Sequence, residues 1–260
     1  TLEEIDKVTK EDILHVYNKI LNSKKVISIA GDVKNSNELS DYFALNFDFM
    51  KTNETESKIP LLDDFLPKES NVEIVKISKA NLNQAQLFQG WIVPSTKSDL
   101  YPKISVMNNI LGGSGLSSRL FVELRDKQGL AYTVRSSYEA LFKSALFSFY
   151  IATEPKNIRK SLDGFIFELT KLAKNPPSDD ELQGAKENLI GRLEYFSQTN
   201  SQLASMEGYN YLAGLGLNYS DKFIKMINAV NSDDVLEAAN YVLNKNSLIC
   251  ALAPNECLNF

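Results

Sequence analysis

The feature that most constrains the fold is an internal repeat. Residues 8–14 (VTKEDIL) align without gaps on residues 230–236 (VNSDDVL), and the likeness continues beyond both segments. Asp12 and its counterpart Asp234 are 222 residues apart. A repeat unit of that length, present once as a tail and once as a whole copy, predicts the end of one domain followed by a second, similar domain.

We therefore expect three parts in the chain. Residues 1–50 are predicted to be the C-terminal remnant of a preceding domain, and residues 71–260 to be the second domain. Residues 51–70 between them are polar and contain two prolines, which is typical of a linker. The sequence begins at Thr1, within an amphipathic pattern, which favours a piece cut from a longer protein.

The order of the expected elements indicates the fold class. Apolar and alternating runs predict strands, and longer segments with the helical period and capping signals predict helices. The strands are expected at 26–30, 72–77, 85–93, 131–137, 145–153 and 248–252, and the main helices at 38–45, 100–111, 116–127, 156–173 and from 179 past 193. Strand pairs separated by paired helices predict an α+β fold, with a two-layer, largely antiparallel mixed sheet and helices on one face. A doubly wound parallel sheet would need regular strand–helix alternation.

Composition excludes several kinds of function. The formal net charge of −5 argues against a nucleic-acid partner, and no apolar run approaches the roughly 18 residues of a membrane span. We expect a soluble protein with no membrane partner, and the sequence does not choose between cytoplasm and periplasm. His15 is the only histidine, so zinc catalysis or a catalytic triad within this chain is not expected. Cys250 and Cys257 are predicted to be free thiols.

One segment carries a family resemblance. Residues 110–132 read ILGGSGLSSRLFVELRDKQGLAY. This segment resembles the second-domain signature of the pitrilysin/insulinase family of zinc peptidases, which includes mitochondrial processing peptidase. The family pattern is a glycine-rich turn, a Ser-Arg-Leu-Phe-like helix start, a Leu-Arg-Glu-Lys-like stretch and Gly-Leu-Ala-Tyr. Similar features extend the resemblance over about residues 3–254, and it implies a processing-peptidase-like half with a sheet covered by helices on one side.

The resemblance also implies what this chain lacks. The family's zinc motif, H-x-x-E-H in the first domain, needs two histidines and cannot be formed around His15 alone. We expect no cofactor in this fragment, with zinc in a missing half of the same polypeptide or on a partner subunit, unless the parent protein has lost it. The expected partners are that zinc-binding domain or subunit and a peptide substrate. The expected function is the substrate-holding half of a zinc endopeptidase, inactive by itself; the alternative is a non-catalytic structural or peptide-binding homologue.

By the same resemblance, Tyr132 is the candidate catalytic residue and Arg125 the candidate substrate-binding residue. In the family, the matching tyrosine donates to the oxyanion of the tetrahedral intermediate, and the matching arginine holds the substrate backbone. Arg125 is expected in the last turn of a helix that Gly129 ends, with Tyr132 at a strand entrance, so both side chains can emerge from one end of the sheet. The structural alternatives are an Arg125–Glu123 pair or helix-dipole contact, and half-buried packing of Tyr132.

The glycines Gly112, Gly113 and Gly115 allow two interpretations. A phosphate loop is excluded, because the segment joins two helices and no Lys-Ser/Thr follows at the required spacing. One interpretation is a flexible turn between the helices. The other, implied by the resemblance, is a shortened form of the glycine-rich substrate loop of processing peptidases.

Overall fold

The computed structural model describes residues 2–23, 25–46, 73–140 and 144–259. The predicted linker at 51–70 lies outside the described residues. The chain divides into two compact units: Thr1–Ile59 with Phe196–Tyr219, and Pro60–Tyr195 with Ser220–Phe260. The second of these units carries the sheet, and we call it the sheet unit.

The sheet has five described strands in the order β1-β5-β2-β4-β3. Strand β1 runs parallel to β5, and the other neighbouring pairs are antiparallel. The strands are β1 (Glu73–Ser78), β2 (Ala85–Val93), β3 (Ala131–Ala140), β4 (Ala145–Thr153) and β5 (Ser247–Ala253). The predicted α+β fold with a largely antiparallel mixed sheet is confirmed, and the predicted bounds of β2 and β4 match the observed ones.

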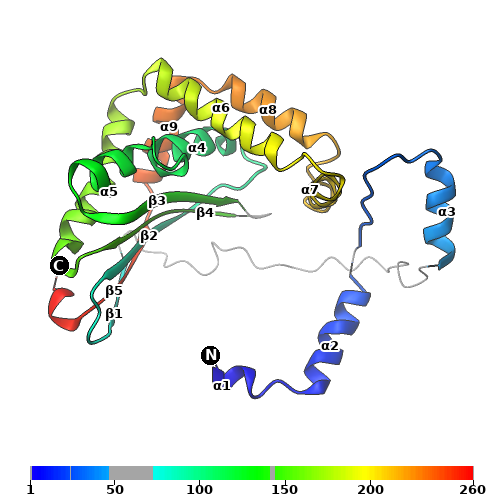
Figure 1. Ribbon diagram of the computed structural model, residues 1–260, viewed down its shortest axis with the longest axis horizontal. Coiled ribbons are helices and arrows are strands. Elements are labelled where there is room, and N and C mark those ends of the chain that lie inside the picture. Colours follow the sequence, from blue (N-terminus) through cyan, green and yellow to red (C-terminus); the bar gives the residue numbers. More distant parts are fainter. Residues whose placement is uncertain (1, 24, 47–72, 141–143, 260) are drawn as a thin grey trace. The chain divides into compact units, whose positions relative to one another are not determined.

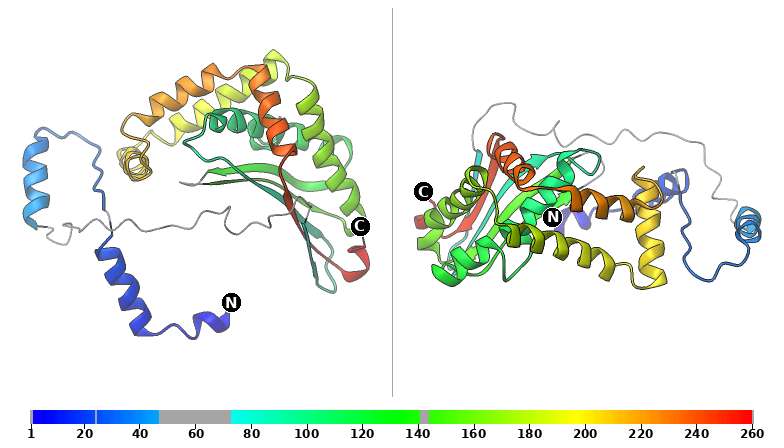
Figure 2. Two further views of the ribbon diagram at one scale, coloured as in Figure 1. Left: turned by 180° about the vertical axis from the view of Figure 1, so that it is seen from behind. Right: turned by 90° about the horizontal axis from the view of Figure 1, so that it is seen from above.

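The helices of the sheet unit gather on one face of the sheet (Figure 1). Figure 2 shows α5 and α9 on that same face. These helices are α4 (Leu100–Asn108), the π-helices η3 (Asn109–Gly113) and η4 (Phe121–Lys127), α5 (Ile158–Lys174), α6 (Asp179–Tyr195), α8 (Tyr219–Ala229) and α9 (Ser232–Leu243), with short 3₁₀ turns η5 (Pro155–Asn157) and η6 (Asn255–Cys257).

The core lies between this helical layer and the sheet. Alternate residues of β2 and β4 are buried, among them Leu87 and Phe147, while most residues between them are half-buried; Gly90 and Ser148 are buried as well. Trp91 and Phe149 meet edge to face with ring centroids 5.4 Å apart, and Phe165 of α5 packs on Phe149 at 5.1 Å. One buried face per strand is what an antiparallel sheet with a single helical layer requires.

The repeat found in the sequence is also a repeat of local structure. The helix α2 (Lys10–Leu21) starts at Thr9, whose hydroxyl accepts from the Asp12 amide while the Asp12 carboxylate accepts from the Thr9 amide. The helix α9 starts with the same reciprocal pair between Asn231 and Asp234. Both helices have 12 residues, so the 222-residue offset relates two helices with equivalent capping boxes.

The two copies differ in burial. The apolar stripe of α9 is covered, with Val235 and Val242 both 0% exposed. The equivalent side chains of α2, Ile13 and Ile20, are 61% and 59% exposed. Among the described residues of its own unit, no element covers the stripe of α2 as the core of the sheet unit covers that of α9.

The first unit contains α1 (Leu2–Ile5), α2, α3 (Ser36–Asn46) and α7 (Asn200–Leu212). The strand predicted at 26–30 is wrong, because this segment makes no strand pairing with the described residues. A strand needs a neighbour to satisfy its backbone groups. The segment instead runs close to α7, where a Cβ on Gly208 would lie 3.1 Å from Ser28 Cβ. Of the described helices, none has the length and apolar character needed to span a bilayer.

Candidate functional site

The chain reverses at the end of η4, between the two sequence-predicted site residues. Gly129 has φ +63°, the left-handed conformation that glycine adopts without steric cost. Its N–H donates to Arg125 O at 2.9 Å, and the Leu130 N–H donates to Leu124 O at 2.9 Å. Thr153 Oγ1 then donates to Leu130 O at 2.6 Å and ties the reversal to β4. The helix end predicted at Gly129 is confirmed, and it holds Arg125 close to the start of β3.

Tyr132 occupies a β-bulge. In the β3–β4 register, Ala131 pairs with Thr153 and Thr133 pairs with Ala152, so Tyr132 is the extra residue. A bulge re-aims the side chain of the extra residue and is frequent beside functional sites. The Tyr132 side chain is 79% exposed on an edge strand, which excludes the half-buried packing role.

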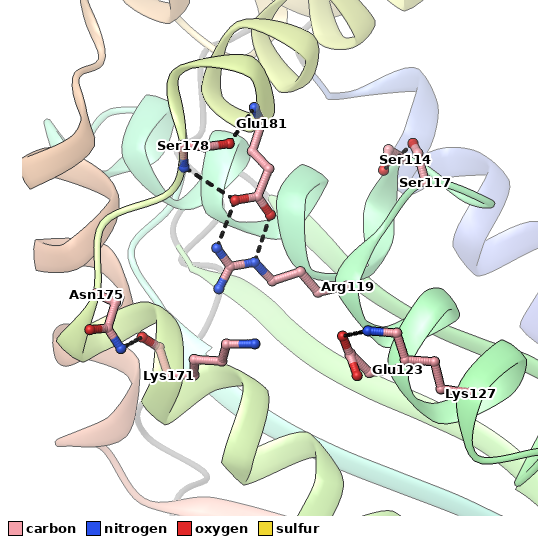
Figure 3. Close-up of polar contacts among 9 residues, drawn as sticks. All are labelled: Ser114, Ser117, Arg119, Glu123, Lys127, Lys171, Asn175, Ser178 and Glu181. Atoms are coloured by element: carbon pink, nitrogen blue, oxygen red, sulfur yellow. Dashed lines mark hydrogen bonds and ion pairs between the residues drawn. The ribbon is translucent and has the colours of Figure 1, made fainter.

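The structure brings Arg125 and Tyr132 into contact. The Arg125 guanidinium carbon lies 4.9 Å from the centroid of the Tyr132 ring and 4.2 Å from that of Phe121, one turn earlier on η4. Stacking on two rings fixes the plane of the guanidinium and leaves its N–H groups at the edge available to an acceptor. No carboxylate of the described residues forms an ion pair with Arg125. Glu123, the alternative partner, pairs with Lys127 at 2.6 Å (Figure 3).

The glycine-rich segment is largely helical. Gly112 and Gly113 belong to η3, so the prediction that they form a flexible turn is wrong; the turn follows them and contains Gly115 at φ +79°. A Cβ on Gly112 would lie 2.2 Å from the Ser136 amide nitrogen on β3. Gly112 is therefore required by the close approach of helix and strand.

These glycines line a cavity of about 600 Å³ that includes neither Arg125 nor Tyr132. Arg192 of α6 closes part of it and donates from Nη1 to Gly113 O at 3.2 Å. The predicted site residues thus fall into two groups, the arginine–tyrosine pair and the glycines. Whether the glycines touch substrate stays a prediction.

A partly buried ion pair positions the segment that carries Arg125. Arg119, just before η4, donates from Nε and Nη2 to the two carboxylate oxygens of Glu181 at 2.8 and 2.9 Å (Figure 3). Glu181 also forms a capping box with Ser178 at the start of α6. The hydrogen bond from Arg119 is the main reason why the pKa of Glu181 lies below its usual range. Sequence reasoning missed this pairing, which joins residues 62 positions apart.

Glu168 of α5 is a buried carboxyl that the sequence did not single out. Its side chain is 2% exposed, and no group of the described residues donates to its Oε2. Burial raises the pKa of Glu168, against the attraction of Lys171. Its neighbourhood holds no metal-ligand cluster, since the described parts of the chain contain no group of three His, Cys, Asp or Glu side chains arranged to bind a metal.

Comparison with known protein families gives one match. The family described as "Peptidase M16 inactive domain" matches residues 7–189. An uncharacterized zinc protease of Rickettsia felis is 26% identical over 258 residues, covering 98% of this chain and 60% of the relative. The uncharacterized zinc protease YmxG of Bacillus subtilis is 28% identical over 178 residues, covering 68% of this chain and 43% of the relative. The chain thus spans about half the length of these relatives.

Solved structures show the same fold. A peptidase M16 inactive domain from Pseudomonas fluorescens superimposes with a TM-score of 0.76 at 22% identity, covering 96% of this chain and 58% of that one. A protease from Helicobacter pylori gives a TM-score of 0.77 at 20% identity, with coverages of 98% and 61%.

Proposed function

Since the chain belongs to the family of peptidase M16 inactive domains, we propose that it is the substrate-holding, metal-free half of a zinc-dependent endopeptidase. In this proposal, Tyr132 donates to the oxyanion formed during peptide hydrolysis, and Arg125 holds the substrate. The observation that carries the proposal is the exposed stack of Arg125 on Phe121 and Tyr132 at a bulged strand start.

The chemistry follows from the two side chains. A phenol can donate one hydrogen bond without adding charge, so it stabilises negative charge that develops on the scissile carbonyl oxygen. The guanidinium presents several N–H groups in one plane, which suits the carbonyl oxygens of an extended peptide. Because the Arg125 plane is fixed by two aromatic rings, less side-chain entropy is lost when it binds.

The zinc of such a peptidase does not fit this chain. The described residues contain no metal-binding group, and His15 is the only histidine. In the proposal, zinc is held by a missing half of the same polypeptide or by a partner subunit. The exposed stripe of α2 supports a similar preceding domain, because the equivalent stripe of α9 is covered by a core.

The test uses the protein assembled with its zinc-binding half. Tyr132→Phe is expected to lower kcat by roughly 100- to 1,000-fold, the usual effect of losing one oxyanion donor, with little change in KM. Arg125→Ala is expected to raise KM as well. Tyr195→Phe, another exposed tyrosine of the sheet unit, is the matched control and should leave both constants unchanged. Full turnover in Tyr132→Phe would return Tyr132 to a structural role.

A second candidate function is a non-catalytic, peptide-binding homologue. It is favoured by one relative, named "Non-peptidase homolog YmxG" in Helicobacter pylori, which is 28% identical over 277 residues and aligns with 98% of this chain. Peptide binding and peptide hydrolysis, measured on the assembled protein, distinguish the two functions. Peptide binding that depends on Arg125, without hydrolysis and without an H-x-x-E-H motif in either half, would favour the second.

A further inference from the structure

A second cavity lies between α5 and the part of the sheet formed by β1, β5 and β2. Its volume is about 380 Å³, within the range of small-molecule sites. Strands β2 and β4 separate it from β3, which carries Tyr132. Most of its wall is apolar: Trp91 and Ile249 belong to the sheet, and Leu162 and Ile166 belong to α5.

Two polar side chains interrupt this apolar wall. Gln89 and Ser247 line the cavity on the helix-covered face of the sheet, with exposed fractions of only 3% and 6%. The Gln89 Nε2 donates to Ser247 Oγ at 3.0 Å. No group of the described residues donates to Gln89 Oε1, although that atom is buried. A buried polar atom without a partner is destabilising, so packing alone does not explain this arrangement.

The cationic side chains that line the cavity already have interaction partners. Arg159 pairs with Asp163 at 3.2 Å, and Lys245 Nζ lies 4.9 Å from the Tyr241 ring centroid. An anion bound at Gln89 would lose its hydration, and the two cationic side chains of the wall already have partners. The cavity therefore favours a neutral ligand.

We propose that this cavity binds a small neutral alcohol, with a compact apolar body against Trp91 and α5 and its hydroxyl on the Gln89 amide. A hydroxyl both donates and accepts, so it pairs with the amide whether the oxygen or the nitrogen of Gln89 faces the cavity. The site is independent of the proposed peptidase function, because it shares no residue with the Arg125–Tyr132 pair.

The test uses the full chain and its single tryptophan. Trp91 lines the cavity, so cyclohexanol should change its fluorescence in a saturable way. Methylcyclohexane has a similar shape but lacks the hydroxyl, and it should bind about tenfold more weakly. Gln89→Leu should abolish this preference. The matched control is Gln86→Leu, on the same strand but facing away from the cavity, and it should keep the preference.

A second variant keeps the proposal testable if Gln89→Leu does not fold. Ile166→Phe places a larger ring in the cavity and should weaken binding of both compounds, with folding checked by circular dichroism. The proposal is overturned by the absence of a saturable change in the wild type. It is equally overturned if Ile166→Phe binds as well as wild type, or if folded Gln89→Leu retains the preference for cyclohexanol.

Discussion

Replacing Gly112 by alanine tests whether the close approach of η3 and β3 requires glycine at this position. The added Cβ would lie 2.2 Å from the Ser136 amide nitrogen and 2.7 Å from Ser136 Oγ. Both distances are far below van der Waals contact. The nearest atom is backbone of β3, which is held by the ladder with β4 and cannot move as a side-chain tip can.

The expected magnitude combines two opposing effects. Overpacking of a tight site costs about 1–3 kcal/mol, and a clash with backbone belongs at the upper end of that range. Alanine recovers about 1 kcal/mol because it is the better helix former. Gly112→Ala is therefore expected to destabilise the protein by about 2 kcal/mol, which lowers Tm by roughly 4–8 °C in a domain of this size.

Gly191→Ala is the matched control. Gly191 lies in α6, and a Cβ there would meet nothing within 4 Å, so the propensity gain acts alone and should raise Tm by roughly 2–4 °C. Thermal unfolding of the three proteins by circular dichroism gives the comparison. If Gly112→Ala melted at or above the wild-type temperature, the packing argument would be refuted.

Two further predictions concern the carboxyl groups of Glu168 and Glu181. Burial raises the pKa of Glu168, so the folded state favours the protonated carboxyl, and the free energy of unfolding falls as pH rises through that raised pKa. Glu168→Gln should therefore raise Tm at neutral pH. The gain should shrink in acid buffer, where the Glu168 carboxyl of the wild type is itself protonated. The pKa of Glu181 is lowered, so its pairing stabilises at neutral pH and is lost as pH falls through the lowered pKa. Arg119→Lys, which cannot form the two-point pair, should therefore lower Tm at neutral pH and less so in acid; equal losses at both pH values would contradict this.

Local signals in the sequence were sufficient for most of the sheet unit. The strands β2 and β4 could be delimited because their apolar runs end in turn-forming residues. The helix end at Gly129 could be predicted because only its own backbone conformation decides it. These features depend on a few neighbouring residues, which is why sequence alone defined them.

The missed features depend on residues far apart in the chain. The bulge at Tyr132 exists only in the register between β3 and β4. Gly112 reads as a turn residue because its sequence neighbours are glycines, whereas its actual constraint comes from Ser136 on another element. The segment 26–30 has the composition of a strand, but a strand also requires a partner to pair with.

The two copies of the repeat show how far the same reasoning extends. Helices α2 and α9 have equivalent capping boxes, so local sequence defines where both helices begin. Only α9 has its apolar stripe covered, and its Asn240 donates to Ala173 O of α5 at 3.0 Å to fix the packing. The apolar stripe of α2, with Ile13 61% exposed, lacks the stabilisation that burial of apolar surface gives to α9. In the proposed peptidase, a preceding sheet unit would cover α2 as the present sheet unit covers α9. One of two similar domains would then bind zinc, and the other would provide the Arg125–Tyr132 pair.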